Sequence, residues 1–273
     1  FTSVPAAPAP ASPADGAANQ PVLPTFSWGA VEQSNGYQLQ VARDAGFSDL
    51  VLDQTAIPGT SFTLASELQT STTYYWRVQT GNTCGVGQFS PVFSFTTLPA
   101  PGDCGPGYAP QVLHEVDFES GAGGWQDAST STYRWALNTA QAHSPSHAQF
   151  AADVSTIADQ RLVSPVISLP ADGGQPLSLS YWNRYSFEST STCYDAGLLE
   201  ISVNGGAWTQ VPSAQLLTQP YNGTVSSSYS NPLAGKSAWC FSQPAWTRSV
   251  VDLDDYAGKT VQFRFRQGSD TGI

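Results

Sequence analysis

The sequence has no methionine, few charged residues and no long apolar run. Without a methionine anywhere in 273 residues, the chain is not expected to begin at its own start codon, and we expect further sequence upstream. No apolar run approaches the roughly 18 residues that a membrane-spanning helix needs. The first residues also lack the basic and apolar regions of a signal peptide. We therefore predict no membrane insertion, and we expect any signal peptide to have been removed or to lie outside this sequence.

Positive charge is scarce as well. Lysine and arginine number 10 against 21 aspartates and glutamates, which gives a formal net charge of −11. This charge opposes polyanions, so nucleic acid and anionic membrane surfaces are poor candidates for partners, and we predict neither. Two explanations of the acidity stay open at this point. It keeps the chain soluble, or some of the carboxylates converge on a cation.

Glycine, proline, serine, threonine and aromatic residues are abundant, and they favour strands and tight turns over helices. Short alternating runs bounded by turn residues recur along the chain, and this pattern predicts an all-β protein built from β-sandwiches. In the first half these runs are 25–28, 36–42, 50–52, 61–64, 73–78 and 93–97. In the second half they are 160–169, 177–182, 197–203 and 260–266, with a hairpin turn at 204–206.

Composition shifts divide the chain into domains. Residues 1–20 form a Pro/Ala-rich stretch that we interpret as a semi-rigid linker, and 99–107 form a second linker. The predicted domains are therefore 21–98 and 108–273. Within the second domain, the Ser/Thr/Asn-rich connection 212–236 is of the kind that carries binding function on β-sandwiches.

The first domain resembles a fibronectin type III domain over nearly its whole length. Trp28 stands where that family keeps its core tryptophan, and the run Leu68–Val78 resembles the family's L-x-P-G-T-x-Y-x-W-R-V pattern, with Thr70 and Ser71 in place of Pro-Gly. The resemblance implies that Tyr74 forms the tyrosine corner, with its hydroxyl bound to upstream backbone. Trp28, Tyr37 and Trp76 are interpreted as core residues. Such domains act as spacers or adhesion modules.

The second domain resembles the MAM-like jelly-roll modules found C-terminal to the catalytic domains of secreted bacterial peptidases, including the cleaved-adhesin domains. The matching segments follow one another in the family's order: 117–125, 142–144, 162–165, 194–208 and 256–265. The resemblance implies a jelly-roll sandwich, secretion, and a non-catalytic accessory role beside a peptidase. The family pattern continues into a closing strand, which we expect to lie beyond Ile273.

The four cysteines are Cys84, Cys104, Cys193 and Cys240, and they allow three pairings. None has the C-x-x-C spacing of zinc or thiol-redox sites. The simplest assignment follows the chain and joins Cys84 to Cys104 and Cys193 to Cys240. Disulfides of this kind imply an oxidising, extracellular compartment.

Calcium is the one cofactor that the sequence suggests, because modules related to the second domain hold a structural calcium ion. Asp117 and Glu119 lie two residues apart, so in a strand both side chains point to one face, where a cation would relieve their repulsion. Asp195 is a third candidate ligand. The alternative is that these carboxylates only form a solvated rim.

No catalytic motif is present, so no enzymatic activity is predicted. His143 and His147 have i,i+4 spacing, but Pro145 between them excludes the helix that a metal-binding histidine pair requires. The adjacent Asp254 and Asp255 diverge and do not make a glycosidase pair. The expected partners are extracellular proteins or glycan surfaces, and the oligomeric state stays open.

Three functional hypotheses stay open. The first is an accessory region of a secreted peptidase, the second a carbohydrate-binding module, and the third a self-standing adhesin. For the second, the candidate platform residues are Trp125, Trp135, Trp239 and Trp246, most of which are expected in the core.

Overall fold

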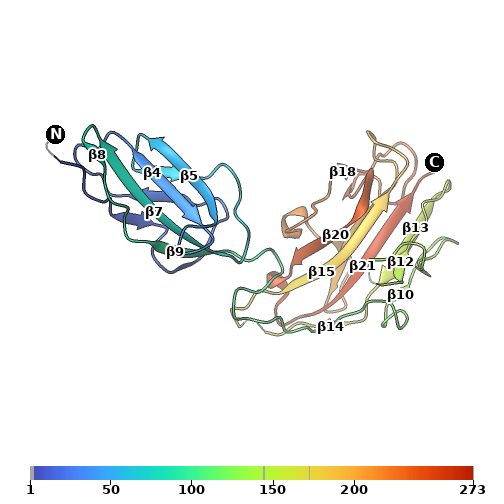
Figure 1. Cartoon of the computed structure of the whole chain (residues 1–273). Helices are drawn as coiled ribbons and strands as arrows, with labels where there is room; N and C mark the ends of the chain where they lie inside the picture. Colours follow the sequence, from blue (N-terminus) through green and yellow to red (C-terminus); the bar gives the residue numbers. More distant parts are fainter. Residues whose placement is uncertain (1–2, 144, 172, 273) are drawn as a thin grey trace. The chain divides into compact units, whose positions relative to one another are not determined.

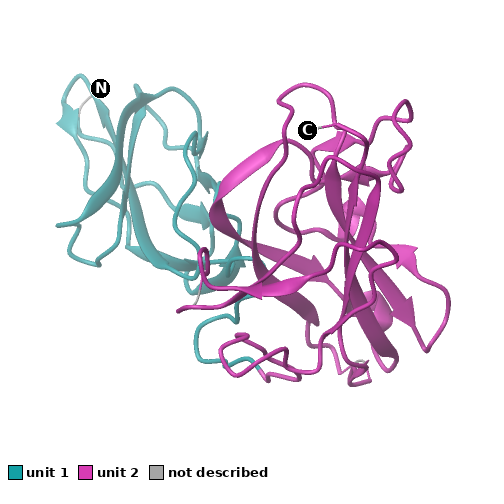
Figure 2. Ribbon diagram, turned by 90° about the vertical axis from the view of Figure 1, so that its right-hand side faces the viewer, with its two compact units in different colours: residues 1–110 teal, residues 111–273 magenta. Residues whose placement is uncertain are grey.

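The computed structural model describes residues 3–143, 145–171 and 173–272, and it divides into two compact units, residues 1–110 and 111–273 (Figures 1 and 2). Within the described residues the regular structure is β, apart from two single-turn 3-10 helices in unit 2. The predicted all-β fold class is therefore confirmed. In this part of the chain, no helix is long and apolar enough to cross a bilayer.

Unit 1 is a β-sandwich of two sheets. Its strands are β1 (Pro10–Ser12), β2 (Ala17–Gln20), β3 (Thr25–Trp28), β4 (Tyr37–Ala42), β5 (Leu50–Ile57), β6 (Ser61–Thr63), β7 (Thr73–Asn82), β8 (Gly85–Val86) and β9 (Phe93–Thr97). One sheet has the order β1-β3-β6 and the other β2-β9-β7-β4-β5, with β8 paired to β7. All of these pairs are antiparallel except β2 with β9.

Alternation along the strands builds the core of unit 1. In β7 every second side chain is buried, which places Tyr74, Trp76 and Val78 on one face. Trp28 from the opposite sheet and Tyr37 are also buried, as predicted. The Tyr74 hydroxyl accepts a hydrogen bond of 3.0 Å from the backbone N–H of Gln69, which is the tyrosine corner. Together these features give unit 1 a fibronectin-type-III-like fold.

The prediction that residues 1–20 form a linker is wrong for residues 10–20, because β1 and β2 lie in this stretch. Two long-range contacts hold the stretch in place. The indole Nε1 of Trp76 donates to the carbonyl oxygen of Pro13 at 3.2 Å, and the Asp15 carboxylate accepts from the backbone N–H of Ser94 at 2.8 Å. Contacts with the rest of the sandwich therefore fix the position of residues 10–20.

The predicted bond between Cys84 and Cys104 is absent from the structure, in which both residues are exposed. Cys84 lies in the turn that leaves the end of β7, whereas Thr96 of β9 pairs with Thr73 at the beginning of β7. β7 is ten residues long, so at about 3.3 Å per residue its two ends are roughly 30 Å apart. The few residues between β9 and Cys104 would span at most about 25 Å if fully extended, and a turn closed by the bond from the N–H of Asp103 to the carbonyl of Ala100, at 2.9 Å, shortens them. Cys104 therefore does not return to Cys84.

Unit 2 contains the remaining strands and both 3-10 helices. They are β10 (Gln126–Asp127), β11 (Ala136–Asn138), β12 (Ala148–Phe150), β13 (Ala158–Val163), β14 (Ile167–Ser168), β15 (Ser178–Ser186), β16 (Ala196–Val203), β17 (Thr209–Gln210), η1 (Ser213–Gln215), β18 (Gly223–Thr224), β19 (Ser237–Ala238), β20 (Ser242–Asp252), η2 (Asp254–Tyr256) and β21 (Thr260–Ser269). The largest sheet has the order β10-β13-β21-β16-β17, with β14 paired to β21. Three further pairs are β15-β20, β11-β12 and β18-β19.

The core of unit 2 lies between the large sheet and the β15–β20 pair. Phe263 and Leu199 from the large sheet share one buried cluster with Val251 of β20, and Tyr181 of β15 packs against it. This arrangement is a second β-sandwich. The jelly-roll assignment and the relation to MAM-like modules stay predictions.

The hairpin predicted at 204–206 is confirmed. Asn204 and Gly205 have φ values of +52° and +70°, and the N–H of Gly206 donates to the carbonyl of Val203 at 2.9 Å. Two successive positive φ values are those of a type I′ turn, whose twist matches that of the flanking strands. The turn connects β16 to β17.

Candidate functional site

The strand register of unit 2 brings several chain ends to one edge of the large sheet. At the end of β21, Gly268 pairs with Ala196 and Ser269 pairs with Ala158. The beginnings of β16 and β13 therefore lie beside the end of β21. The residues that flank these strands are gathered at this edge, and several of them are acidic.

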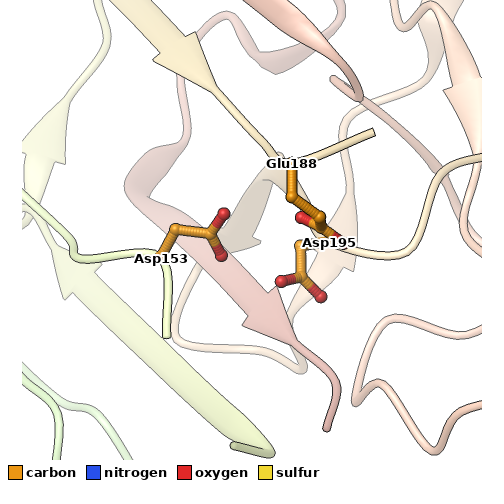
Figure 3. A group of neighbouring side chains, drawn as sticks. All are labelled: Asp153, Glu188 and Asp195. Atoms are coloured by element: carbon orange, nitrogen blue, oxygen red, sulfur yellow. The ribbon is translucent and has the colours of Figure 1, made fainter. Parts of the chain in front are cut away.

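Three carboxylates form a cluster at this edge, which we call the acidic cluster: Asp153, Glu188 and Asp195. Asp153 follows β12, Glu188 follows β15, and Asp195 directly precedes β16. One oxygen from each of the three lies within 4.8 Å of the others, and Figure 3 shows the Asp153 carboxylate pointing toward the other two. In the described part of the chain, this is the one group of His, Cys, Asp and Glu side chains placed to hold a metal ion.

Side chains of the large sheet hold Asp153 in position. The amides of Gln160 and Gln267 both donate to the carbonyl of Ala152, at 2.6 and 3.1 Å, and both side chains are buried. The Ser269 hydroxyl donates to the carbonyl of Thr156 at 2.9 Å. The connection from β12 to β13 is therefore fixed on both sides of Asp153.

Asp195 is held by two neighbouring segments. Its Oδ1 accepts from the backbone N–H of Asp270 at 2.7 Å and from the Asn231 amide at 3.4 Å. The same Asn231 amide donates to the carbonyls of Tyr194 and Gly268, at 2.7 and 2.9 Å. Asn231 therefore ties the beginning of β16 to the end of β21.

The predicted disulfide between Cys193 and Cys240 is formed, with a Cα–Cα distance of 5.4 Å. Cys193 lies two residues before Asp195, and both cysteines are buried. The bond fixes the end of the loop that carries Glu188 and Asp195 against the strand region around Cys240. The acidic cluster is therefore built on a cross-linked part of unit 2.

Two oxygens of the acidic cluster are buried without a hydrogen-bond partner, Oδ1 of Asp153 and Oδ2 of Asp195. The Asp195 side chain is almost completely buried, with 1% of the residue exposed. A buried carboxylate oxygen without a donor costs free energy, and in most proteins a donor or a cation satisfies it. The cluster therefore has the charge and the open valences of a cation site.

The pKa values of the cluster point the same way. Burial, followed by the neighbouring Asp153, raises the pKa of Asp195 to about 8. Burial is also the largest cause that raises the pKa values of Asp153 and Glu188. Like charges this close do not all ionise without a counter-ion. In the absence of a cation, the cluster therefore retains a proton at neutral pH.

Other buried carboxylates of unit 2 are neutralised by arginines. Asp159 pairs with Arg161 and Arg266, and Glu200 pairs with Arg264 and Arg266. Burial raises the pKa of Asp159, but the bonds from Arg266 and Arg161 outweigh it, so its pKa is lowered. Between described residues, no ion pair involves a member of the acidic cluster.

The donor set decides which cations fit. All three ligands offer carboxylate oxygens, which hard divalent cations prefer, whereas zinc favours His and Cys. Two oxygens bound to one calcium ion at 2.3–2.6 Å can lie up to about 5 Å apart. The spacing of the cluster, within 4.8 Å, is compatible with that limit.

The structure brings only Asp195 of the three predicted metal ligands into the acidic cluster. Asp117 and Glu119 were expected on a strand, but the residues from 111 to 125 form none, and Phe118 between them has a φ of +65°. The Asp117 Oδ1 accepts from the backbone N–H of Glu119 at 3.0 Å. The premise for placing both carboxylates on one face was therefore wrong.

Glu119 binds the segment 146–147 instead. Its carboxylate accepts from the hydroxyl of Ser146 at 2.5 Å, from the Nδ1 of His147 at 2.8 Å, and from both backbone N–H groups at 2.9 and 2.8 Å. Hydrogen bonds from Ser146 and then His147 lower the pKa of Glu119 to about 2. Donors therefore already satisfy this carboxylate.

Ser146, His147 and Glu119 have the residue types of a hydrolytic triad but not its geometry. In a triad the acid binds Nδ1 of the histidine and the serine binds Nε2. Here the Ser146 hydroxyl and the Glu119 carboxylate both contact Nδ1, at 2.9 and 2.8 Å. The histidine therefore does not lie between the acid and the nucleophile. The three side chains form a closed hydrogen-bonded group instead.

Asp153 and Glu188 were missed because nothing in their local sequence marks them. Both stand in loops, separated from Asp195 by 42 and 7 residues, and only the strand register brings them together. The one indication of the site in the sequence was Asp195, an acidic residue directly before the strand β16. Of the predicted aromatic candidates, Trp125 and Trp239 are buried in the core, whereas Trp135 and Trp246 are partly exposed.

No family model and no curated protein matches the chain. Solved structures with some likeness include an Fn3-like protein from Clostridium thermocellum, 16% identical, covering 35% of this chain and 92% of that one, with a TM-score of 0.27. An α-L-rhamnosidase from Dictyoglumus thermophilum is 15% identical. The match covers 96% of this chain and 25% of the rhamnosidase, with a TM-score of 0.29. The chicken CNTN1 FN1–FN3 domains are 12% identical, with 98% and 62% coverage and a TM-score of 0.27. At these TM-scores the likenesses assign neither family nor function.

Proposed function

We propose that this chain is a non-catalytic accessory region of a larger secreted hydrolase, a peptidase, and that its second unit is a binding module stabilised by calcium. Unit 2 supplies the surface that contacts an extracellular protein or glycan. Unit 1 serves as a spacer or adhesion module beside it.

The acidic cluster is the observation that carries the calcium part of the proposal. It combines three carboxylates, a buried Asp195 oxygen without a partner and, among the described residues, no arginine paired with a member of the cluster. Calcium takes six to eight oxygens in flexible geometry, and backbone carbonyls or water complete the shell. Magnesium demands a stricter octahedron and keeps more of its water, which suits a cluster with a buried ligand such as Asp195 less well.

The accessory role rests on three further points. The motifs of the second half follow the order found in modules beside secreted peptidases. Unit 1 has a fibronectin-type-III-like fold, which serves as a spacer in many exported proteins. The bond between Cys193 and Cys240 fits an oxidising compartment, where structural disulfides persist.

A calcium titration followed by thermal unfolding tests the calcium part. A ligand that binds only the native state stabilises it by about 2.7 kcal/mol at a hundredfold excess over Kd. We expect the melting temperature of the parent to rise with calcium and that of Asp195→Asn to stay unchanged. Asp117→Asn is the matched control, and it should respond as the parent does. An unchanged parent, or a loss of response only in Asp117→Asn, would refute the site.

The accessory part is tested by assaying casein, peptides and glycosides with the purified chain. We expect no hydrolysis. Turnover that survives repurification and disappears with one substitution in this chain would show that the region is itself an enzyme. If the chain is part of a larger hydrolase, the rest of that protein should contain a peptidase motif, and further β-repeats alone would favour an adhesin.

A further inference from the structure

One strand of unit 2 has a free edge. β15 pairs with β20 on one side, and no other strand of the described chain pairs with it (Figure 1). β15 is nine residues long and contains no proline and no lysine, the residues with which natural sheets commonly protect an exposed edge. The free edge of β15 is therefore long enough to accept another strand.

The hydrogen bonds of β20 show which backbone groups face that edge. The carbonyl of Val250 accepts from the N–H of Leu217 at 2.9 Å, so the backbone groups of Val250 point away from β15. Val250 pairs with Ser180, and in an antiparallel ladder both members of such a pair point outward, at every second position. The outward-facing residues of β15 are therefore Ser180, Trp182, Arg184 and Ser186.

The same alternation continues past the register shift between Asn183 and Tyr185. There the N–H of Phe187 donates to the carbonyl of Phe241 at 2.7 Å, on the side of β20. Outside the ladder with β20, no hydrogen bond between described residues uses the backbone of the four outward-facing residues. Trp182, the second of them, is 47% exposed. The edge therefore presents unpaired donors and acceptors at the surface.

A cleft opens beside this edge. Arg184 and Ser186 belong to its lining, and its other walls come from β12, β16 and β21. Aromatic rings of the lining include Phe150, Tyr185 and Phe265. The volume is about 200 Å³, below the roughly 300–1,000 Å³ of pockets for drug-sized molecules. The cleft therefore has room for one large apolar side chain of a strand that pairs with β15.

Arg184 supplies a positive charge that has no anion. The lining also contains Arg266, but Asp159 and Glu200 pair with it. Between described residues, Arg184 forms no ion pair, and the register shift leaves it without a cross-strand partner on β20. Asp153 lines the cleft too, but its carboxylate points toward the acidic cluster (Figure 3). An acidic group on the occupant therefore finds its counter-ion in Arg184.

We propose that the free edge of β15 binds an extended segment of an extracellular protein as an added β-strand, with an acidic residue beside Arg184 and an apolar neighbour in the cleft. An extended polypeptide alternates N–H and C=O groups at the spacing of a ladder, so it can satisfy all four outward-facing residues. Successive side chains of a strand point to opposite faces. The acidic residue can therefore lie on the face of Arg184 while its neighbours lie on the face of Tyr185, which packs against the core.

The proposal names the partner for the binding role of unit 2 and rests on that role. Other occupants fit the edge less well. A glycan has no backbone of alternating N–H and C=O groups, so it would leave the ladder positions unpaired. A second copy that paired through its own β15 would bring no acidic residue to Arg184, because the strand contains none. It would also bring a further net charge of −11.

The test is a titration of the whole chain with acetylated and amidated heptapeptides, followed by calorimetry and NMR. The reference peptide has aspartate at its centre, leucine on either side and threonine elsewhere. A second peptide has lysine at the centre, and a third is the reference peptide with N-methyl groups on alternate residues, including the aspartate. We expect the lysine peptide to bind about fivefold more weakly than the reference, and the N-methylated peptide at least tenfold more weakly.

Charge reversal in the protein tests the role of Arg184. In Arg184→Glu the preference should invert, so that the lysine peptide binds more tightly than the aspartate peptide. Lys236→Glu is the matched control, because Lys236 directly precedes β19 and does not belong to the lining of the cleft. This variant should prefer the aspartate peptide as the parent does. Thermal melts establish that both variants are folded.

Amide hydrogen exchange measured by NMR reports on the edge itself. In the free chain, the amides of Ser180 and Trp182 should exchange fast, whereas those of Leu179 and Tyr181, which face β20, should exchange slowly. Saturating reference peptide should slow exchange at Ser180 and Trp182 at least tenfold. The exchange at Leu179 and Tyr181 should change little.

Five results would overturn the proposal. They are no binding of the reference peptide at millimolar concentration, equal binding of the N-methylated peptide, bound peptide without protection of the outward-facing amides, an unchanged preference in Arg184→Glu, and a structure of the larger protein in which one of its own segments pairs with β15. Cello- and chito-oligosaccharides are titrated alongside. Their binding without peptide binding refutes the added strand and keeps the binding role of unit 2. Binding of neither class refutes both.

Discussion

Asp195→Asn should stabilise the chain in the absence of calcium, although it removes a native side chain. Asparagine keeps an oxygen that accepts from the backbone N–H of Asp270, as the Asp195 Oδ1 does at 2.7 Å. Its amide group can also donate to the Oδ1 of Asp153, which has no partner in the parent. The substitution therefore removes the group that must take up a proton on folding, and it keeps a donor that can reach Asp153.

The pKa of Asp195 gives the magnitude and the sign. It is raised from 3.8 to about 8, so between these pH values the folded chain holds a proton that the unfolded chain has lost. The stability that the protonated form provides is complete below about pH 4 and falls with rising pH until about pH 8. At pH 7 the loss amounts to at most about 4 kcal/mol.

The assay is thermal unfolding of parent, Asp195→Asn and the control Asp117→Asn between pH 4 and pH 9. In chelator, the parent and the control should lose stability with rising pH, and Asp195→Asn should not. A difference of about 4 kcal/mol corresponds to roughly 10 °C in a unit of this size. In saturating calcium the order should invert, because the ion replaces the proton in the parent and has no full ligand set in Asp195→Asn.

Two results would refute this reasoning. One is a parent that, in chelator, keeps its melting temperature from pH 4 to pH 8. The other is an Asp195→Asn variant that melts in parallel with the parent under all conditions. Either would mean that Asp195 is ionised and already satisfied in the folded chain.

Three further substitutions test other parts of the structure. Tyr74→Phe removes the bond to the N–H of Gln69 and should destabilise unit 1 by about 1–3 kcal/mol in denaturant unfolding, and full stability would contradict the tyrosine corner. Replacing both Cys193 and Cys240 by serine removes a bond that closes a loop of 47 residues, and it should lower the free energy of unfolding by about 4 kcal/mol. Cys104→Ser should leave the melting temperature unchanged. A larger loss of stability in Cys104→Ser than in the double variant would contradict the assigned bond. Glu200→Gln leaves Arg264 buried without its anion and should cost about 3–5 kcal/mol in equilibrium unfolding, and a neutral effect would show that the pair is not formed.

Local patterns predicted β3, β4, β5, β6, β7 and β9 of unit 1, and alternate burial is clearest in β3, β7 and β9. The alternation of Tyr74, Trp76 and Val78 is visible in the sequence, and the structure buries these three residues. The same rule does not reveal β20, because its run Ser242–Asp252 mixes a proline and polar residues with only a short buried stretch. Its pairing with β15 comes from the packing of unit 2.

The Pro/Ala-rich stretch shows where composition misleads. Proline and alanine indicate an extended chain, and β1 and β2 are extended on either side of a turn at 15–16. Composition does not reveal which distant residues this stretch will contact. The contacts from Trp76 to Pro13 and from Ser94 to Asp15 join residues that are 63 and 79 positions apart. Long-range contacts of this kind turn an apparent linker into two strands.

The candidate site was predictable in one residue of three. Asp195 stands directly before an alternating run, so its place at the end of a strand followed from the sequence. Asp153 and Glu188 join it only through the register of β13, β16 and β21, which no local pattern specifies. The same limit applies to Cys84 and Cys104, which are consecutive cysteines in the sequence. Cys84 follows the end of β7, whereas Cys104 follows β9, whose last residues lie beside the beginning of β7.

The most direct test of the cation site is a crystal structure of the chain with calcium, with anomalous differences measured at long wavelength. We predict one anomalous peak among the carboxylates of Asp153, Glu188 and Asp195, with metal–oxygen distances of about 2.3–2.6 Å. A peak at Asp117 and Glu119 instead, or an acidic cluster without a peak at saturating calcium, would contradict it.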